Sequence, residues 1–284
     1  LSEQGISFPQ IAPPRQILYR LDNQLNQIHD ETLSTIKDTK NGLGYFRYQA
    51  IKYLKGDLKK NYNQADLISE QLAHIMRILL VKRIDSSFHA FRMSLKRYLD
   101  ANRAMLKMIQ NNRIYVAPSL HVNEFILNDD EDALQKILQE CDDPLQIQCF
   151  EAEDFAAEFI EGIRKDQGIL EKLSDLWDQV EVDPKYDELL VRLKNELFNK
   201  DINNNHKLVI FSESKETTDY ITRRLQDDGY SRILTVDSHN IDDRADTVRH
   251  NFDANEAITR QENNYDILII TEVLAEGINL HRSN

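Results

Sequence analysis

The C-terminal part of the chain decides the fold: residues 206–225 read HKLVIFSESKETTDYITRRL and residues 263–284 read NNYDILIITEVLAEGINLHRSN. Residues 207–211 and 266–271 are short runs rich in Ile, Leu and Val, a pattern typical of strands buried on both faces of a parallel sheet. Residues 233–236 form a further short strand of this kind. Helical patterns separate the strands, and this alternation predicts an open α/β sheet.

Polar side chains stand where two of these strands end. Ser212 follows the first strand and Thr271 closes the last, and open parallel sheets place their ligands at the carboxyl ends of strands. The next helix starts near Ser214, so the serines of this turn are either N-caps or contacts for a phosphate. Both roles stay open. That helix is expected to stop at Gly229, and residues 244–252 predict another helix.

These segments carry a family resemblance. Residues 207–221 (KLVIFSESKETTDYI) resemble motif IV of superfamily II helicases, and residues 266–280 (DILIITEVLAEGINL) resemble motif V. Arg244, followed eight residues later by Phe252, is similar to the Arg…Phe pair between those motifs in the Swi/Snf-like branch. The resemblance implies the C-terminal half of such a helicase or translocase.

Two upstream segments extend the resemblance. Residues 183–197 resemble the helix that leads into the second RecA-like lobe, and residues 79–95 resemble a helical segment of bacterial members, some of which also carry a phospholipase-D-like domain. The implied fold class is α/β with a large all-helical insertion: a helical bundle followed by a RecA-like parallel-sheet lobe. We expect a linker from the first lobe at 1–16, a helical insertion domain at 17–155 and the second lobe at 156–284.

The motifs that hydrolyse ATP are missing from this sequence. No G-x-x-x-x-G-K-[ST] loop occurs and no Asp-Glu-x-His box is present, and such a loop is what cradles the phosphates. The arginines of motif VI would lie beyond Asn284. We therefore expect ATP and magnesium to be held mainly by a first RecA-like lobe of the same polypeptide, and this chain alone not to hydrolyse ATP.

The resemblance also implies residue roles. Thr271 would lie beside the nucleic-acid backbone, as would Ser212 in the phosphate alternative. Gly277 and Asn279 would border the nucleotide in the cleft between the lobes, where a glycine permits close approach. Arg244 has two open alternatives: it reaches a phosphate, or it forms a salt bridge with Asp266.

A basic segment precedes the lobe. Residues 74–113 contain nine Lys or Arg and two acids. If residues 87–110 form one helix, four cations fall within roughly 60° of each other. These are Arg92, Lys96, Arg103 and Lys107. The stripe either meets nucleic-acid phosphates, or it is a solvated helix edge or a partner for the acidic segment at 114–163. Charged edges are the default for amphipathic helices, which favours the second interpretation.

An acidic segment follows. Residues 114–163 contain thirteen acids and one Lys. They either cover the basic stripe until nucleic acid arrives or form a solubilising surface, and the second interpretation is favoured. No His accompanies these carboxylates at ligand spacing, so no metal site is expected.

Residues 155–180 follow a helical repeat that includes Trp177, which we assign to a core. Asp183 and Pro184 have the pattern of an N-cap and the first turn of the next helix.

Bulk composition sets the remaining limits. The chain has 284 residues, a formal net charge of −13 and two cysteines. An acidic balance is not the overall signature of a nucleic-acid binder. Two cysteines without metal-ligand spacing favour a reducing compartment, and no apolar run reaches the ~20 residues of a membrane span, so we expect a cytoplasmic protein that does not engage a membrane.

The sequence therefore predicts the C-terminal portion of an ATP-dependent translocase acting on nucleic acid, with double-stranded DNA as the expected form. The alternative is a non-catalytic, helicase-derived interaction module that docks a partner such as a nuclease or RNA polymerase. A phosphate loop upstream in the same reading frame would discriminate the two.

Overall fold

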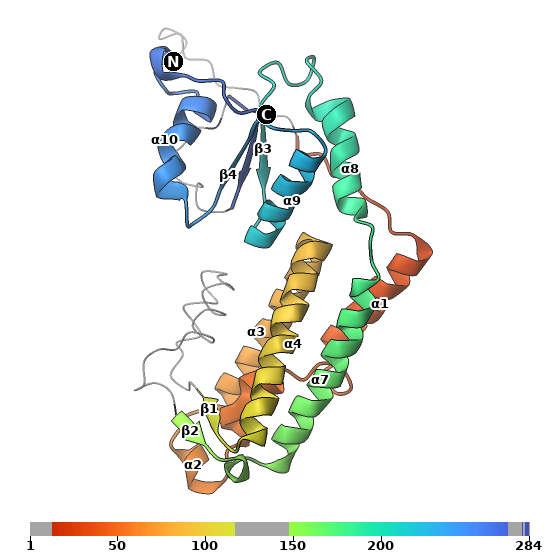
Figure 1. The fold of residues 1–284 in the computed structure, drawn as a ribbon, viewed down its shortest axis with the longest axis vertical. Coiled ribbons are helices and arrows are strands. Elements are labelled where there is room, and N and C mark those ends of the chain that lie inside the picture. Colours follow the sequence, from red (N-terminus) through yellow and green to blue (C-terminus); the bar gives the residue numbers. More distant parts are fainter. Residues whose placement is uncertain (1–12, 117–147, 272–279, 281, 284) are drawn as a thin grey trace. The chain divides into compact units, whose positions relative to one another are not determined.

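The computed structural model describes residues 13–116, 148–271, 280 and 282–283 (Figure 1). It divides into two compact units, one formed by Asp22–Glu181 and the other by Leu1–Leu21 with Val182–Asn284. The first is a helical unit and the second an α/β unit, in agreement with the coarse fold class expected from the sequence. Among the helices in the described part of the chain, none combines the length and hydropathy needed to cross a membrane.

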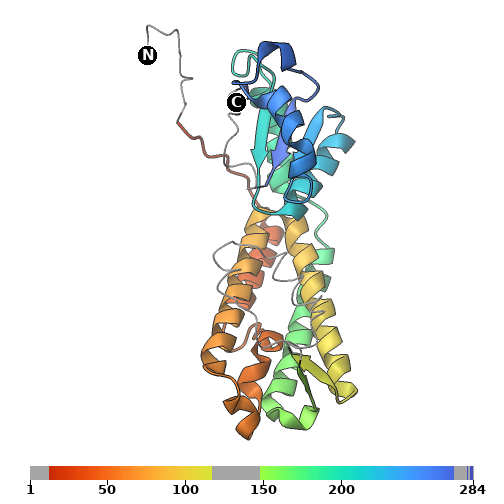
Figure 2. The same ribbon diagram turned by 90° about the vertical axis from the view of Figure 1, so that its left-hand side faces the viewer.

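The helical unit is built from three long helices and several shorter elements. In chain order the elements are α1 (Asn23–Lys37), η2 (Phe46–Tyr53), α2 (Gly56–Lys60), α3 (Ala65–Ser86), α4 (Phe88–Gln110), β1 (Ile114–Val116), β2 (Gln148–Phe150), η3 (Ala152–Asp154) and α7 (Ala157–Asp178). Helices α3, α4 and α7 run alongside one another (Figures 1 and 2). The helix predicted at 87–110 is confirmed as α4, and the Ser87 hydroxyl caps it by accepting a hydrogen bond from the Ala90 N–H at 3.0 Å.

Trp177 lies in the core of the helical unit, as predicted. Its side chain is fully buried, and its ring packs edge-on against Phe88 and Phe91 with centroids 5.0 Å away in each case. The indole N–H donates a hydrogen bond to Thr32 Oγ1 at 2.9 Å. The one polar atom of the ring is therefore satisfied inside the core, which is the requirement for burying a tryptophan.

Helix α7 belongs to the helical unit. The Asn102 side chain of α4 donates a hydrogen bond to the Ile163 carbonyl of α7 at 3.0 Å, and Phe159 and Ile163 are fully buried in the core beside Met105. The compact helical unit thus extends to Glu181. We place the boundary between the units there, and not at 155/156, because the apolar face of α7 is buried against α4.

The α/β unit contains a three-stranded parallel sheet in the order β3-β5-β4. Its elements are α8 (Pro184–Arg192), η4 (Leu193–Leu197), β3 (Leu208–Phe211), α9 (Lys215–Asp227), β4 (Ile233–Val236), α10 (Ile241–Phe252), η5 (Ile258–Arg260) and β5 (Ile267–Ile270). The three predicted strands and the helix predicted at 244–252 are confirmed. Asp183 caps α8 by accepting from the Tyr186 N–H at 3.1 Å, with Pro184 in the first turn, as expected.

The sheet is covered on both faces (Figure 1). Ile267 and Ile269 of β5 lie in a core cluster with Leu225 of α9, whereas Leu268 and Ile270 lie in a cluster with residues of α10. Alternate side chains of a strand point to opposite faces. A central strand covered on both sides must therefore be apolar throughout, which explains the ILII sequence of β5.

Candidate functional site

The carboxyl ends of the three strands bring together residues from three separate segments. Ser212, Asp237 and Thr271 directly follow β3, β4 and β5. The Ser212 N–H donates to the Ile270 carbonyl at 3.1 Å, and the Thr271 N–H donates to the Val236 carbonyl at 3.2 Å. The backbone pairing of the sheet thus continues one residue beyond the strands. Thr271 lies between the other two, so the structure brings Ser212 and Thr271 to one edge of the sheet, as the sequence predicted.

Two serines shape the turn from β3 into α9. Ser214 is the N-cap of α9, since its hydroxyl accepts from the Thr217 N–H at 3.3 Å. The Ser212 hydroxyl accepts from the Ser214 N–H, also at 3.3 Å. The N-cap role is therefore confirmed for Ser214, and the first turn of α9 begins at the sheet edge. Phosphate contact by these serines stays a prediction.

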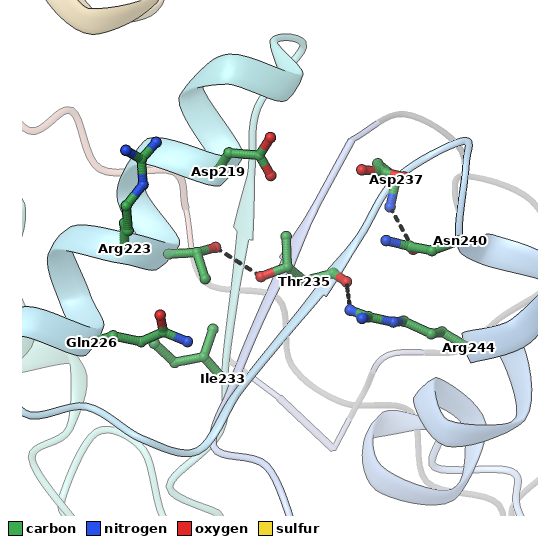
Figure 3. Close-up of a pocket in the computed structure, with 9 residues that line it drawn as sticks. Asp219, Arg223, Gln226, Ile233, Thr235, Asp237, Asn240 and Arg244 are labelled. Atoms are coloured by element: carbon green, nitrogen blue, oxygen red, sulfur yellow. Dashed lines mark hydrogen bonds between the residues drawn. The ribbon is translucent and has the colours of Figure 1, made fainter.

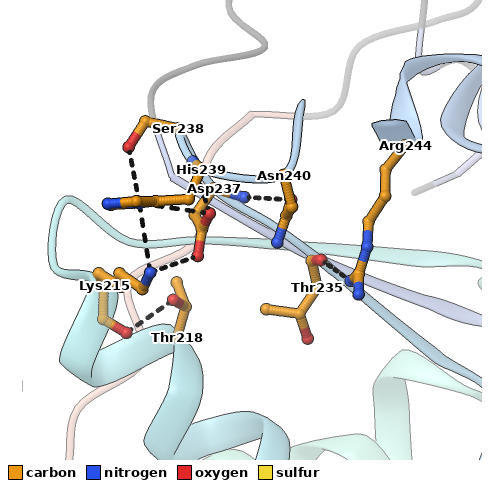
Figure 4. Close-up of polar contacts among 8 residues, drawn as sticks. All are labelled: Lys215, Thr218, Thr235, Asp237, Ser238, His239, Asn240 and Arg244. Carbon is orange, nitrogen blue, oxygen red and sulfur yellow. Dashed lines mark hydrogen bonds and ion pairs between the residues drawn. The ribbon is translucent and has the colours of Figure 1, made fainter. Parts of the chain in front are cut away.

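A cluster of charged and polar side chains lies at the same edge, and we name Lys215, Asp237 and His239 the strand-end triad (Figure 4). Lys215 Nζ lies 3.1 Å from Asp237 Oδ2 and 3.3 Å from His239 Nδ1. Asp237 Oδ1 accepts the backbone N–H of His239 at 2.8 Å. Asn240 Oδ1 accepts the backbone N–H of Asp237 at 3.0 Å, which fixes the loop between β4 and α10.

Asp237 is the anchor of the triad. Its side chain is only 6% exposed, against 33% for Lys215 and 68% for His239. Burial by itself would raise the pKa of Asp237, but the hydrogen bonds from the Lys215 ammonium and the His239 N–H outweigh it and lower the pKa. The nearby Asp219 of α9 has its pKa raised, chiefly by burial. The site therefore holds one firmly ionised carboxylate with a more exposed cation and imidazole around it.

Arg244 does not form the salt bridge with Asp266 that was one of its two expected roles. Its Nη1 donates to the carbonyl of Thr235 on β4, while Asp266 pairs with Arg232 at 3.0 Å. The Thr235 carbonyl is held in this way because β4 pairs only with β5 among the described strands.

Arg244 also lines a cavity of about 360 Å³ between α9, β4 and α10 (Figure 3). Thr235 contributes its hydroxyl to this wall and shares a hydrogen bond of 2.7 Å with Thr222. Arg223 and Gln226 of α9 form one side of the cavity, and Asn240 lies on the other. The cavity is polar and beside the strand-end triad. Phosphate contact by Arg244, the other expected role, stays a prediction.

The two residues expected at the nucleotide, Gly277 and Asn279, lie outside the described residues. Within the described ranges, no group of three or more His, Cys, Asp or Glu side chains is arranged to hold a metal ion.

Two of the four cations in the basic stripe of α4 make contacts within the helical unit. Arg92 Nη1 donates to the Val180 carbonyl just beyond α7 at 2.7 Å. Arg103 pairs with Asp100 at 3.6 Å and with Glu171 of α7 at 3.5 Å. Lys96 and Lys107 are exposed. Two of the four expected nucleic-acid contacts therefore have partners within the helical unit. None of these partners lies in the acidic segment at 114–163, of which residues 117–147 are outside the described residues, so pairing of the stripe with that segment stays a prediction.

Sequence reasoning missed the strand-end triad. The signal was present, because Asp237, Ser238, His239 and Asn240 follow the strand correctly predicted at 233–236. The sequence prediction used only the residues that follow the first and last strands, Ser212 and Thr271. The rule that sites form at the carboxyl ends of parallel strands applies to the third strand equally.

Comparisons of the chain with family models, curated proteins and solved structures gave no match. The fold and site define the class of protein: an α/β unit with a polar site at the carboxyl end of its parallel sheet, accompanied by a mostly helical unit. That unit is not all-helical as expected, because β1 and β2 form a short antiparallel pair within it. Any narrower assignment depends on the residues that resemble motifs IV and V.

Proposed function

We propose that this chain is the second-lobe half of an ATP-dependent nucleic-acid translocase of the Swi/Snf-like type, and that the carboxyl end of its sheet binds the phosphate backbone of double-stranded DNA. One observation carries the proposal. Parallel strands bring Ser212, Thr271 and the strand-end triad to a single edge, beside the first turn of α9.

The chemistry of this edge suits phosphate. Hydroxyls and backbone N–H groups bind phosphate oxygens without reading a base. The first turn of a helix adds the positive end of its dipole. Lys215 stands in that turn, and lysines at a phosphate backbone contribute through counterion release. Hydroxyl and ammonium donors along one edge thus form a surface for a polyanion and not for a specific base sequence.

The ATP-related part of the proposal rests on the resemblance alone. In it, Gly277 and Asn279 border the nucleotide, and the first RecA-like lobe of the same polypeptide supplies most contacts to ATP and magnesium. Arg244 and the exposed Lys96 and Lys107 are proposed as further backbone contacts.

Binding of a short fluorescent DNA duplex by the whole chain tests the proposal. Fluorescence anisotropy at low ionic strength should show binding that weakens steeply with added salt. The double variant Ser212→Ala/Thr271→Ala should bind about thirtyfold more weakly, since each lost phosphate hydrogen bond is worth about 1 kcal/mol.

A matched control lies at the other end of the sheet. Ser231 is exposed just before β4, and Ser231→Ala should bind like the parent chain. Circular dichroism must show that all variants fold. Equal binding by the double variant and the parent chain, or no duplex binding at low salt, would overturn the proposed contact.

A further inference from the structure

Two groups of the strand-end triad, the Lys215 ammonium and the His239 ring, share the buried carboxylate of Asp237 (Figure 4). Asp237 Oδ2 faces Lys215 Nζ at 3.1 Å, and Asp237 Oδ1 lies 3.7 Å from His239 Nδ1. Lys215 Nζ and His239 Nδ1 are themselves 3.3 Å apart. The arrangement is a closed triangle of two nitrogen groups and one carboxylate.

The contact between Lys215 and His239 requires a neutral imidazole. A lysine ammonium has three donors and no acceptor, so His239 Nδ1 must accept with its lone pair while the proton resides on Nε2. Ser238 Oγ lies 3.3 Å from the same nitrogen. In this state the triad carries one positive and one negative charge, and Lys215 is held by both of its partners.

Protonation of His239 removes one of these partners. Both ring nitrogens then donate, so Nδ1 faces the ammonium with a proton instead of a lone pair. The imidazolium and the ammonium repel each other and share the single carboxylate of Asp237. Asp237 is held in place by its burial and by the hydrogen bond from the backbone N–H of His239. The Lys215 side chain, in contrast, is a third exposed and has a flexible stem.

The other charged groups around the ring do not neutralise the added proton at contact distance. From α9, the Ser214 hydroxyl donates to Glu216, and Asp219, whose pKa is raised chiefly by burial, lies one turn beyond Lys215. From α10, Asp242 and Asp243 in the first turn are exposed. Asp237 is the only carboxylate within 4.0 Å of His239 among the described residues.

We propose that His239 is a proton-operated switch that frees Lys215 for phosphate. When the imidazole gains a proton, the triad gains one positive charge, and Lys215 Nζ turns from His239 and Asp237 toward a bound polyanion. This inference rests on the proposed function, because the polyanion is the phosphate backbone that the strand ends are proposed to bind. It adds regulation: the same edge binds more tightly at mildly acidic pH.

Duplex binding by the whole chain at two pH values tests the switch. When the pH is lowered from about 8 to about 6, a range in which histidine side chains can change charge, the parent chain should bind about fivefold more tightly at fixed salt. The slope of binding against salt should steepen by about one phosphate contact. His239→Asn retains an acceptor near the position of Nδ1 but cannot be protonated, so its affinity should stay flat with pH.

His206 supplies the control variant. It lies 3.9 Å from Asp266 and is half exposed, but it precedes β3 at the opposite end of the sheet. Its φ of 55° is a left-handed conformation that asparagine tolerates. His206→Asn should keep the full rise in affinity of the parent chain. If the rise survives in His239→Asn, or disappears in His206→Asn, the switch is wrong while the proposed function stands.

A measurement without DNA distinguishes failure of the switch from failure of the proposed function. In an NMR titration, the ε-methylene signals of Lys215 should shift with the same midpoint as the ring signals of His239, and Asp237→Asn should move that midpoint. If no duplex binds at any pH, the proposed function fails, and coupled titration of the two residues still supports the switch. Independent titration of Lys215 and His239 would overturn it.

Discussion

The two ends of the parallel sheet each contain a buried charged group, and the groups differ in how they are paired. At the carboxyl end, Asp237 faces the Lys215 ammonium and accepts the His239 N–H. At the amino end, Lys207 is 2% exposed; its Nζ donates to the Tyr265 carbonyl at 2.7 Å.

The pKa of each of these two groups follows from its pairing. The paired Asp237 has a lowered pKa despite its burial. Burial dominates at Lys207 and lowers its pKa to about 8. Its ammonium lies over the Phe252 ring, 4.7 Å from the centroid, which compensates only in part for lost hydration. The carboxyl end thus holds a stabilised charge, Asp237, that can organise a binding site. The amino end holds a charge, Lys207, that destabilises the folded state.

The largest expected effect is on stability at the amino end. The folded pKa of Lys207, about 8, lies below the ordinary value of 10.5. Between these values the unfolded chain binds more protons, so the contribution of Lys207 to stability rises with pH. Below about pH 8 the depressed pKa costs up to roughly 3 kcal/mol.

Lys207→Met removes this titration. In urea unfolding at a series of pH values, the free-energy difference between parent and variant should favour the variant near neutral pH and shrink as pH rises toward 10.5, the ordinary value for lysine. A difference that does not change with pH would show that Lys207 is not strained, and the contrast between the two ends would disappear.

A smaller effect on the free energy of unfolding is expected when one carboxylate at each end of the sheet is neutralised. Asp237→Asn should lower the free energy of unfolding by about 2 kcal/mol, because it breaks a buried, charged hydrogen bond. Asp266 is 24% exposed and pairs with Arg232, so Asp266→Asn should cost less than about 1 kcal/mol. Urea midpoints near neutral pH measure both.

The pH dependence of the Asp237 contribution sharpens this comparison. Because its folded pKa is lowered, its contribution is present above the ordinary value of about 4 and is lost as pH falls below it. Parent and Asp237→Asn should therefore become more alike in acid. Equal losses for the two carboxylates near neutral pH would contradict the view that only the carboxyl end holds a firmly paired charge.

The sequence predicted the elements well and the contacts between them poorly. Strand positions follow from local patterns, since β5 (Ile267–Ile270) is apolar throughout and lies between two covered faces. The core position of Trp177 follows from helical periodicity. The domain boundary does not, because the apolar face of α7 fits either unit until its partner is known, and that partner is α4.

In the candidate site, too, local positions were predicted from the sequence and contacts between distant segments were not. Ser212 and Thr271 were predicted because each ends a recognisable strand. The contact between Lys215 and Asp237 joins α9 to the loop after β4, and no spacing within one segment reveals it. Arg92 and Arg103 were placed on one stripe correctly, but their partners Val180 and Glu171 lie far along the chain. Charge alone does not say whether a cation is free.

The smallest effect compares one cation from each end in duplex binding. At about pH 6, where the proposed switch frees Lys215 from Asp237 and His239, Lys215→Gln removes a charge beside the strand-end hydroxyls, so the slope of log affinity against log salt should fall by about one. Arg232→Gln removes a charge at the amino end, where the guanidinium is already committed to Asp266 and the Asn263 carbonyl, and the slope should not change. The two variants alter the net charge of the chain equally, so any difference between them reports position and not overall repulsion by an acidic protein. If the slope fell equally in both variants, duplex affinity would depend only on the net charge of the chain. The carboxyl end of the sheet would then not be a distinct binding site for phosphate.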